Sequence, residues 1–365
     1  MRAVRTGKTI KQMNTGRPMD YLRACRDKSF EESPFSLTDA ILLCNITYID
    51  LKGIAPEDGA AVTFAEMDKK IDRKRVFSNP LYGQMYLEMF ELMKDSRRYG
   101  NIRTGYFREK LDRDEEAQFG AMTFFLDTGR IFVAFRGTDG SWLGWKEDFN
   151  YAYLEVMPSE KLGLEYLNEV ASETTQEMYV GGHSKGGTIA VYSASNTAED
   201  IQDRIVQVFS VDGIGFRKGF YELDGFRRIE ERVCKVVPEE AFIGRIFEIE
   251  PNYRIAKSFE RGMEQHDFMN WMVEGKSLVF LEKFSRKRNR RAVKFNKWIT
   301  RLSKDQARNF VDTLFEIIGA ANVDYIDQIF LEPKKYIKSL LKKLFSLKGS
   351  RRRAFFRTAF KYVIS

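Results

Sequence analysis

The alternation of apolar and polar positions first predicts two helices in the N-terminal third of the chain. Ser36 and Asp39 form the pattern of a capping box, with a helix expected from there to about Tyr48. A second helix is expected over Pro80 to Lys94, where apolar residues recur at helical spacing: Leu81, Met85, Met89 and Leu92.

Further along, the period changes from helical to strand-like. Ala121–Leu126 and Arg130–Phe135 are short aromatic and β-branched runs. The turn-forming Asp127-Thr128-Gly129 separates them, which predicts a hairpin.

The middle of the chain then alternates between the two periods. A helical pattern over Ser159–Thr174 precedes a short strand at Glu177–Val180, and a helix rich in small residues follows at Thr188–Ser195. Two more buried-looking strands are expected at Ile205–Val211 and Arg232–Val237. Strands that alternate with helices predict an α/β fold: a mostly parallel central sheet with helices on both faces.

Charge divides the chain into parts that the apolar pattern does not separate. Residues 283–365 hold 22 Lys and Arg against 6 Asp and Glu, whereas residues 1–282 hold 38 against 46. We therefore expect a flexible basic lead over 1–32, a globular domain over 33–282 and a basic C-terminal extension over 283–365. The extension should be helical, with amphipathic segments at Ala292–Leu302, Gln306–Ile318 and Pro333–Leu347.

Composition excludes several classes of protein. No apolar run reaches the length of about 18 residues that spans a bilayer, and the N-terminus has no apolar segment of a secretory signal. The cysteines Cys25, Cys44 and Cys234 are scattered, without metal-ligand spacing. This pattern favours a reducing cytoplasm, and we expect neither a metal nor another cofactor.

Gly182-His183-Ser184-Lys185-Gly186 fits the Gly-x-Ser-x-Gly nucleophile elbow. Glycines two positions either side of the serine let a strand and a helix approach closely, and the sharp turn lifts the hydroxyl of Ser184 clear of the sheet. The expected strand before the motif and the small-residue helix after it supply the required context. The N–H of Lys185, at the helix start, would face a developing oxyanion.

A serine hydroxyl needs a base, and the chain has two histidines. His183 adjoins Ser184 on the turn, where neighbouring side chains diverge, so His266 is the expected base. The acid stays open between two candidates. Asp212 directly follows the strand at 205–211, and Glu240 follows the next strand after a proline. We favour Asp212; a carboxylate that only shapes its own loop is the alternative.

The second oxyanion donor should come from the loop after an earlier strand. Phe135-Arg136-Gly137-Thr138 supplies such a loop, in which Thr138 offers its N–H and its hydroxyl. We expect an ion pair between Arg136 and Asp148 to hold this loop in place.

These motifs together resemble a known family. Phe135 to Thr138, with Trp145 and Asp148 downstream, is similar to the pattern of class 3 lipases, and the serine motif strengthens the match. From about Met19 to about Phe315 the chain resembles the bacterial lipase-like family of unknown function DUF2974, or Mbeg1-like. The stretches that carry this resemblance are 29–35, 144–149, 182–187, 212–216 and 265–267.

The resemblance implies an α/β-hydrolase fold, with Ser184 and His266 in a triad and with Thr138 and Lys185 in the oxyanion hole. It leaves the substrate open. Class 3 lipases carry their acid after the strand that ends here at Val237, where the best-matching position is Ala241 with Glu240 beside it. This departure favours Asp212.

The resulting hypothesis is a serine hydrolase that cleaves small-molecule or lipid acyl esters through an acyl-enzyme on Ser184. Two alternatives use the same fold: a catalytically idle scaffold that binds a lipid or protein partner, and a thioesterase or peptidase with the same triad. The sequence does not indicate an oligomeric state.

The basic extension has three readings. It can be a solvated face packed on the domain, or residues 333–365 can bind an anionic membrane surface through clustered lysines opposite Leu and Phe. The second reading would place the protein peripherally at the inner membrane surface. Nucleic-acid binding through Arg351-Arg352-Arg353 is disfavoured, because no recognised nucleic-acid motif accompanies that run.

Overall fold

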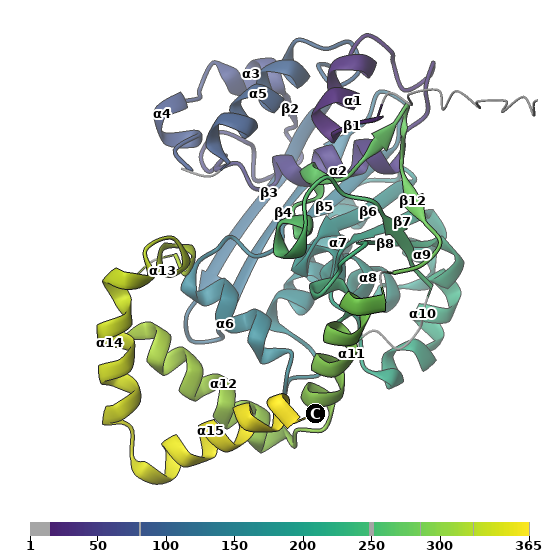
Figure 1. The fold of residues 1–365 in the computed structure, drawn as a ribbon. Helices are drawn as coiled ribbons and strands as arrows, with labels where there is room; N and C mark the ends of the chain where they lie inside the picture. The colour runs from purple at the N-terminus through teal and green to yellow at the C-terminus, as the bar shows by residue number, and fades with distance from the viewer. Residues whose placement is uncertain (1–14, 80–81, 248–251, 285, 324, 365) are drawn as a thin grey trace, which may run out of the picture.

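The computed structural model describes residues 15–79, 82–247, 252–284, 286–323 and 325–364. A nine-stranded sheet forms its centre (Figure 1). In spatial order the strands are β12 (Phe280–Leu281), β9 (Arg254–Ala256), β8 (Val233–Pro238), β7 (Ile205–Val211), β6 (Met178–His183), β5 (Ile131–Phe135), β4 (Ala117–Phe125), β3 (Arg103–Asp112) and β2 (Val62–Thr63). A small second sheet pairs β1 (Thr15–Gly16), β10 (Val273–Glu274) and β11 (Ser277–Leu278).

The five strands from β5 to β9 run parallel, and the strands at either side of them are antiparallel. The predicted hairpin is confirmed as β4–β5, and the three predicted strands after it are β6, β7 and β8. The prediction missed β3, because its half-exposed sequence mixes charged residues with apolar ones.

Helices cover both faces of the sheet, as the sequence predicted. The covering helices are α1 (Pro18–Cys25), α2 (Leu37–Ile46), α3 (Phe64–Asp68), α4 (Arg73–Val76), α5 (Gly83–Lys94), α6 (Trp142–Asn150), α7 (Pro158–Glu173), α8 (Lys185–Asn196), α9 (Glu199–Arg204) and α10 (Asp224–Ile229). Each face of the sheet has its own hydrophobic core, and alternate residues of β5 point into one core or the other. Phe132 packs with α1, α2 and α5, whereas Val133 packs with α7 and α8. The parallel centre with two covered faces is the α/β-hydrolase fold.

The predicted flexible lead is wrong for residues 15–32. Met19, Tyr21, Leu22 and Cys25 form one apolar side of α1 and are buried in the same core as α2 and α5. The amphipathic spacing was concealed by the basic residues around it. The N-terminal limit of the folded part therefore lies before residue 33, while residues 1–14 of the predicted lead lie outside the described part.

A buried ion pair fixes this N-terminal segment to the domain. Arg98 bonds both carboxylate oxygens of Asp39 at 2.8 and 2.7 Å, and both side chains are fully buried. Arg98 also donates to the carbonyl oxygens of Ser29 and Ser33, and Tyr21 donates to Asp39. The guanidinium group of Arg98 therefore holds the backbone around residues 28–33 in place.

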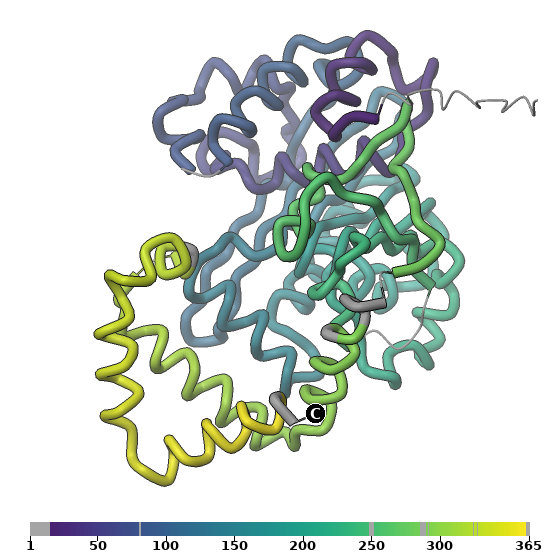
Figure 2. Tube along the Cα trace, viewed as in Figure 1, coloured from purple at the N-terminus to yellow at the C-terminus, as the bar shows by residue number. Residues whose placement is uncertain are grey.

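The basic extension is helical, as predicted. It comprises α11 (Arg286–Thr300), α12 (Lys304–Gly319), α13 (Asp327–Leu331), α14 (Pro333–Ser346) and α15 (Gly349–Ile364). Just before α13 the chain contacts the domain, where Ile326 donates its N–H to the carbonyl of Gly140 at 3.0 Å. α14 then leads away from the domain, and α15 returns to α11 (Figure 2). Trp298 on α11 donates its indole N–H to the carbonyl of Thr358 at 3.0 Å, which ties the two ends of the loop together. No helix among the described residues is long and apolar enough to cross a membrane.

Candidate active site

The turn between β6 and α8 has the strained geometry of a nucleophile elbow. Ser184 has φ 56° and ψ −130°, in a region that residues other than glycine rarely occupy. A methyl group on Gly182 would lie 2.3 Å from the backbone of Gly186, and one on Gly186 would lie 2.2 Å from the carbonyl oxygen of Phe135. Only glycine fits at these two positions, because the backbone at the start of α8 contacts the backbones of β6 and β5 there.

Three side chains meet in a line at the carboxyl end of the sheet. The Oγ of Ser184 lies 3.0 Å from Nε2 of His266, and Nδ1 of His266 lies 2.6 Å from Oδ2 of Asp212. A carboxylate can only accept, so the proton is on Nδ1 and Nε2 is free to accept from the serine. The structure thus brings together the nucleophile, base and favoured acid of the sequence prediction.

The backbone of Asp212 is also strained, with φ 48° at the end of β7. Its side chain is buried, and its second oxygen accepts the N–H of Gly244 at 3.1 Å. The alternative acid, Glu240, does not face His266: it accepts the N–H of Gly262 at 2.8 Å instead. Of the two carboxylates that the sequence left open, Asp212 is the one that lies within hydrogen-bond distance of His266.

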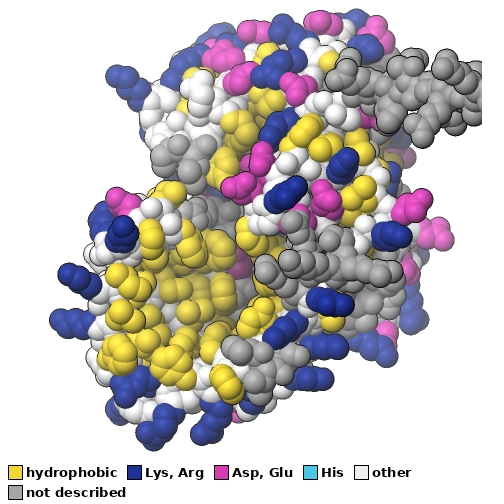
Figure 3. Space-filling model, in the orientation of Figure 1, with side chains coloured by type: hydrophobic (Ala, Val, Ile, Leu, Met, Phe, Trp, Pro, Cys, Tyr) yellow, Lys and Arg dark blue, Asp and Glu magenta, His cyan; other side chains and the backbone are white. Residues whose placement is uncertain are grey.

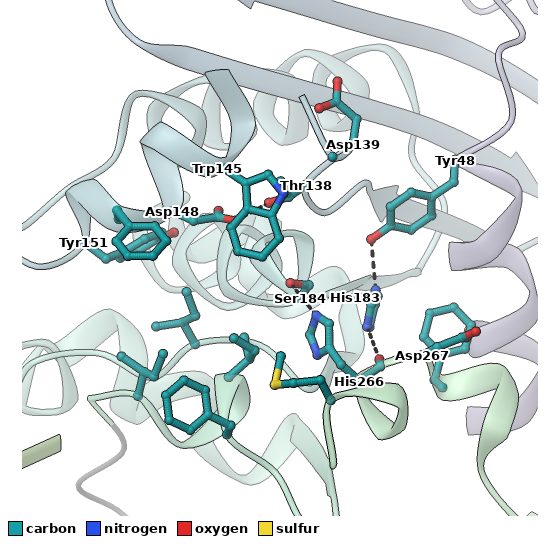
Figure 4. A pocket seen from close by; sticks show the side chains of 18 of the residues that line it. Tyr48, Thr138, Asp139, Trp145, Asp148, Tyr151, His183, Ser184, His266 and Asp267 are labelled. Carbon is teal, nitrogen blue, oxygen red and sulfur yellow. Dashed lines mark hydrogen bonds between the residues drawn. The ribbon is translucent and has the colours of Figure 1, made fainter. Parts of the chain in front are cut away.

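His183, the other histidine, contacts the backbone of His266. His183 does not approach the serine oxygen; its Nε2 donates to the carbonyl of His266 at 2.8 Å, and its Nδ1 lies 2.9 Å from the hydroxyl of Tyr48 (Figure 4). Because that carbonyl can only accept, the tyrosine must donate to Nδ1. Burial lowers the pKa of His183, which favours this neutral form.

Tyr48 extends this chain to the loop after β5. Its oxygen accepts the N–H of Gly137 at 3.1 Å, so one tyrosine connects the oxyanion loop with the histidine loop. The sequence prediction ended a helix near Tyr48 without assigning it a role. No local motif marks the residue, since its partners are 89 and 135 positions away.

Thr138 lines the cavity beside Ser184 and donates its hydroxyl to Oδ2 of Asp148 at 2.5 Å. Its backbone N–H has no acceptor among the described residues, and neither has the N–H of Lys185 at the first position of α8. Both donors are thus available to an oxyanion. The predicted Arg136–Asp148 ion pair is wrong: Arg136 lies over Gly120 and pairs with Glu109 at 2.6 Å.

The side chain of Lys185 turns away from the site into the core. Its ammonium group bonds Glu147 at 2.8 Å and both the backbone and side-chain oxygens of Gln118, and the Lys185–Glu147 pair is fully buried. Glu147 accepts, in addition, the backbone N–H groups of Gln118 and Ser159. This network anchors the start of α8 to β4 and α6, directly behind the candidate nucleophile.

Ser184 and His266 open into a cavity of about 460 Å³. Its walls are mostly apolar and aromatic, with contributions from the extension as well as from the domain: Trp145 and Phe149 on α6, Phe295, Trp298 and Ile299 on α11, and Phe310 and Val311 on α12. The described residues contain no group of three or more His, Cys, Asp or Glu that could hold a metal ion. The site is thus an apolar pocket with a few convergent polar groups.

A scan against family models matches the Mbeg1-like model over residues 93–316. The chain belongs to the Mbeg1-like family. This membership confirms the predicted lipase-like family, and the match includes the elbow, the oxyanion loop, Asp212 and His266. A search of curated proteins found no match. Among solved structures, the chain is similar to the crystal structure of M37 lipase, with 12% identity over 65% of this chain and 79% of that one and a TM-score of 0.37.

The buried carboxyl group of Asp148 is expected to make the stability of the protein depend on pH. Burial raises the pKa of Asp148 from 3.8 to about 6, and its Oδ1 has no partner among the described residues. The folded state therefore binds the proton more tightly, and stability should fall as pH rises from about 4 to about 6. Asp148→Asn should raise the free energy of unfolding by roughly 1–2 kcal/mol at pH 8 and by less at pH 5, as measured by denaturant melts. An equal gain at both pH values would contradict a titration origin.

Proposed function

We propose that this protein is a serine hydrolase that cleaves acyl esters through a covalent acyl-enzyme on Ser184. The observation that carries the proposal is the continuous Ser184–His266–Asp212 hydrogen-bond line, with distances of 3.0 and 2.6 Å. Nucleophile, base and orienting acid at these distances are the requirement for activating a serine.

The first half of the reaction forms the acyl-enzyme. As Oγ of Ser184 attacks the ester carbonyl carbon, its proton moves to Nε2 of His266. The carbonyl oxygen becomes an oxyanion and accepts the backbone N–H groups of Thr138 and Lys185. Collapse of this tetrahedral intermediate breaks the bond to the alcohol, which leaves with the proton from His266.

The second half regenerates the serine. A water molecule gives a proton to His266 and attacks the acyl carbon, and the second tetrahedral intermediate collapses to the carboxylic acid. The proton on His266 returns to Oγ of Ser184. Asp212 keeps Nδ1 protonated and stabilises the imidazolium that forms in each half.

The lining of the cavity supports an apolar acyl group. Aromatic side chains from three helices surround the space beside Ser184, including Trp145, Trp298 and Phe310. Such a lining recovers free energy when it removes hydrocarbon from water, at about 25 cal/mol per Å². The described residues that line it include no Lys or Arg that would bind a peptide carboxylate or a phosphate.

A fluorophosphonate probe tests the proposal directly, because it labels serines that are activated in the folded protein. We expect mass spectrometry to place the label on Ser184, with none on the Ser184→Ala variant or on heat-denatured protein. Folded wild-type protein that remains unlabelled would favour the catalytically idle scaffold. A matched panel of p-nitrophenyl esters and thioesters would then distinguish ester from thioester cleavage in labelled protein.

A further inference from the structure

The C-terminal helices expose an unusual amount of apolar surface. Phe330, Phe345 and Phe360 are 70, 64 and 60% exposed. They lie in a set of exposed apolar residues on α13, α14 and α15, here called the apolar face: Phe330, Leu331, Ile337, Leu341, Phe345, Phe356 and Phe360. Figure 3 shows hydrophobic side chains gathered in a hollowed area over this extension, with Lys and Arg at its outer edge. Contiguous exposed apolar surface marks an interaction site.

On α14 the exposed residues form two parallel stripes. Ile337, Leu341 and Phe345 recur every four residues, and all three are exposed. Lys334, Lys338 and Lys342 recur with the same spacing beside them and are exposed as well. A four-residue spacing keeps side chains on one side of a helix, so an apolar stripe runs next to a basic stripe.

The same arrangement is present on α15. Phe356 and Phe360 are exposed at four-residue spacing, and Arg353, Arg357 and Lys361 follow the same period beside them. Two successive helices thus present phenylalanines flanked by cations.

The charges on these helices have one sign. From Pro333 to the end of the chain the sequence has 11 Lys and Arg and no Asp or Glu. Lys343 and Arg351 share one acidic partner, Glu316 on α12. Lys338, Lys342, Arg353 and Arg357 have no acidic partner among the described residues, so their charge is available to a ligand outside the chain.

Charge and apolarity together select the kind of partner. A second copy of the chain would bring two sets of like charges together, which opposes association. A nucleic acid would neutralise the cations but leave the phenylalanines in water. The surface of an anionic bilayer satisfies both, since rings enter the headgroup region while Lys and Arg bind the lipid phosphates.

We propose that the apolar face and the cations beside it dock the protein on an anionic phospholipid bilayer. The extension that carries this face also supplies a wall of the Ser184 cavity through Phe295, Trp298 and Phe310. Docking therefore brings the candidate active site to the lipid surface. The docking itself goes beyond the proposed hydrolysis, because none of the residues that it uses belongs to the triad.

Vesicle co-sedimentation of the full-length protein tests this proposal. We expect binding to vesicles of phosphatidylcholine with about 30% phosphatidylglycerol and much weaker binding to phosphatidylcholine alone. A charge variant (Lys338→Glu, Lys342→Glu, Arg353→Glu, Arg357→Glu) and an apolar variant (Leu341→Ser, Phe345→Ser, Phe356→Ser, Phe360→Ser) should each weaken binding by at least about tenfold. A control variant with exposed residues changed elsewhere (Lys69→Glu, Lys70→Glu, Leu223→Ser) should bind as the wild type does.

Three outcomes would overturn the proposal. The first is a wild-type protein that does not sediment with the anionic vesicles, or a charge variant and an apolar variant that both bind these vesicles as well as the wild type does. The second is tight binding to DNA that the apolar variant retains, with no binding to vesicles. The third is a dimer in sedimentation velocity that the apolar variant dissociates. Hydrolysis of a soluble ester, measured on the same variants, keeps a failure of docking distinct from a failure of the proposed function.

Discussion

Replacing Ser184 with alanine is expected to lower kcat/KM for a soluble p-nitrophenyl ester by about 10⁶-fold, as loss of a triad serine does in other hydrolases. The variant lacks the hydroxyl oxygen that lies 3.0 Å from Nε2 of His266 and that we propose as the nucleophile. The fold should be unaffected, because alanine has the same β-carbon as serine at this strained backbone position. Steady-state kinetics with purified protein, alongside circular dichroism, measure both effects.

The His266→Ala variant and the double variant show whether the two residues act as one unit. Members of one catalytic unit give losses that do not add, so the double variant should be no slower than the Ser184→Ala variant. If the Ser184→Ala variant kept activity within tenfold of the wild type, Ser184 would not be the nucleophile, even if the fluorophosphonate probe labelled it.

Changing Asp212 to asparagine is expected to lower kcat by about 10⁴-fold with little change in KM. An amide at this position donates to Nδ1 of His266, which shifts the ring proton to Nε2. The nitrogen that faces Ser184 then carries a proton and cannot accept one. The residue is buried and also accepts the N–H of Gly244, so the exchange of one oxygen for nitrogen changes the tautomer with little change in shape.

Glu240→Gln is the matched control for this prediction. Glu240 lies in the loop after the next strand and bonds the N–H of Gly262, within the 3₁₀ turn that ends at His266. Its amide should lower kcat by less than about threefold, because the acceptor oxygen is retained and His266 keeps Asp212. Equal losses in the two variants would mean that the loop rather than the carboxylate at Asp212 determines activity.

Local patterns were sufficient for the parallel strands β5 to β8, though not for the short β9, and for several of the longer helices, such as α7, α8 and α12. β7 was predicted residue for residue, because its Ile, Val and Phe residues form a short β-branched and aromatic run with clear ends. β3 and α1 were missed for the opposite reason. Charged residues interrupt the apolar pattern of each element, so the pattern is not recognisable in a single sequence.

In the candidate site, too, residues within one local motif could be predicted, whereas contacts between distant segments could not. Ser184 and Lys185 lie in one contiguous motif, and His266 followed because the chain has only two histidines. Asp212 could be ranked above Glu240 but not settled, since only the folded chain shows which strand end faces His266. Tyr48 and the true partner of Arg136 were out of reach, because both contacts join segments that are distant in the sequence and have no motif in common.

Two adjacent residues of α6 connect the C-terminal extension with the candidate active site. Glu147 holds the lysine behind the nucleophile, and Lys146 bonds Asp312 on α12 at 2.7 Å. Removing residues 283–365 would leave the buried Lys146 without Asp312 and open one side of the cavity. The extension is thus packed into the domain rather than appended to it, and a chain cut at residue 282 should be less stable and should lose part of the cavity wall.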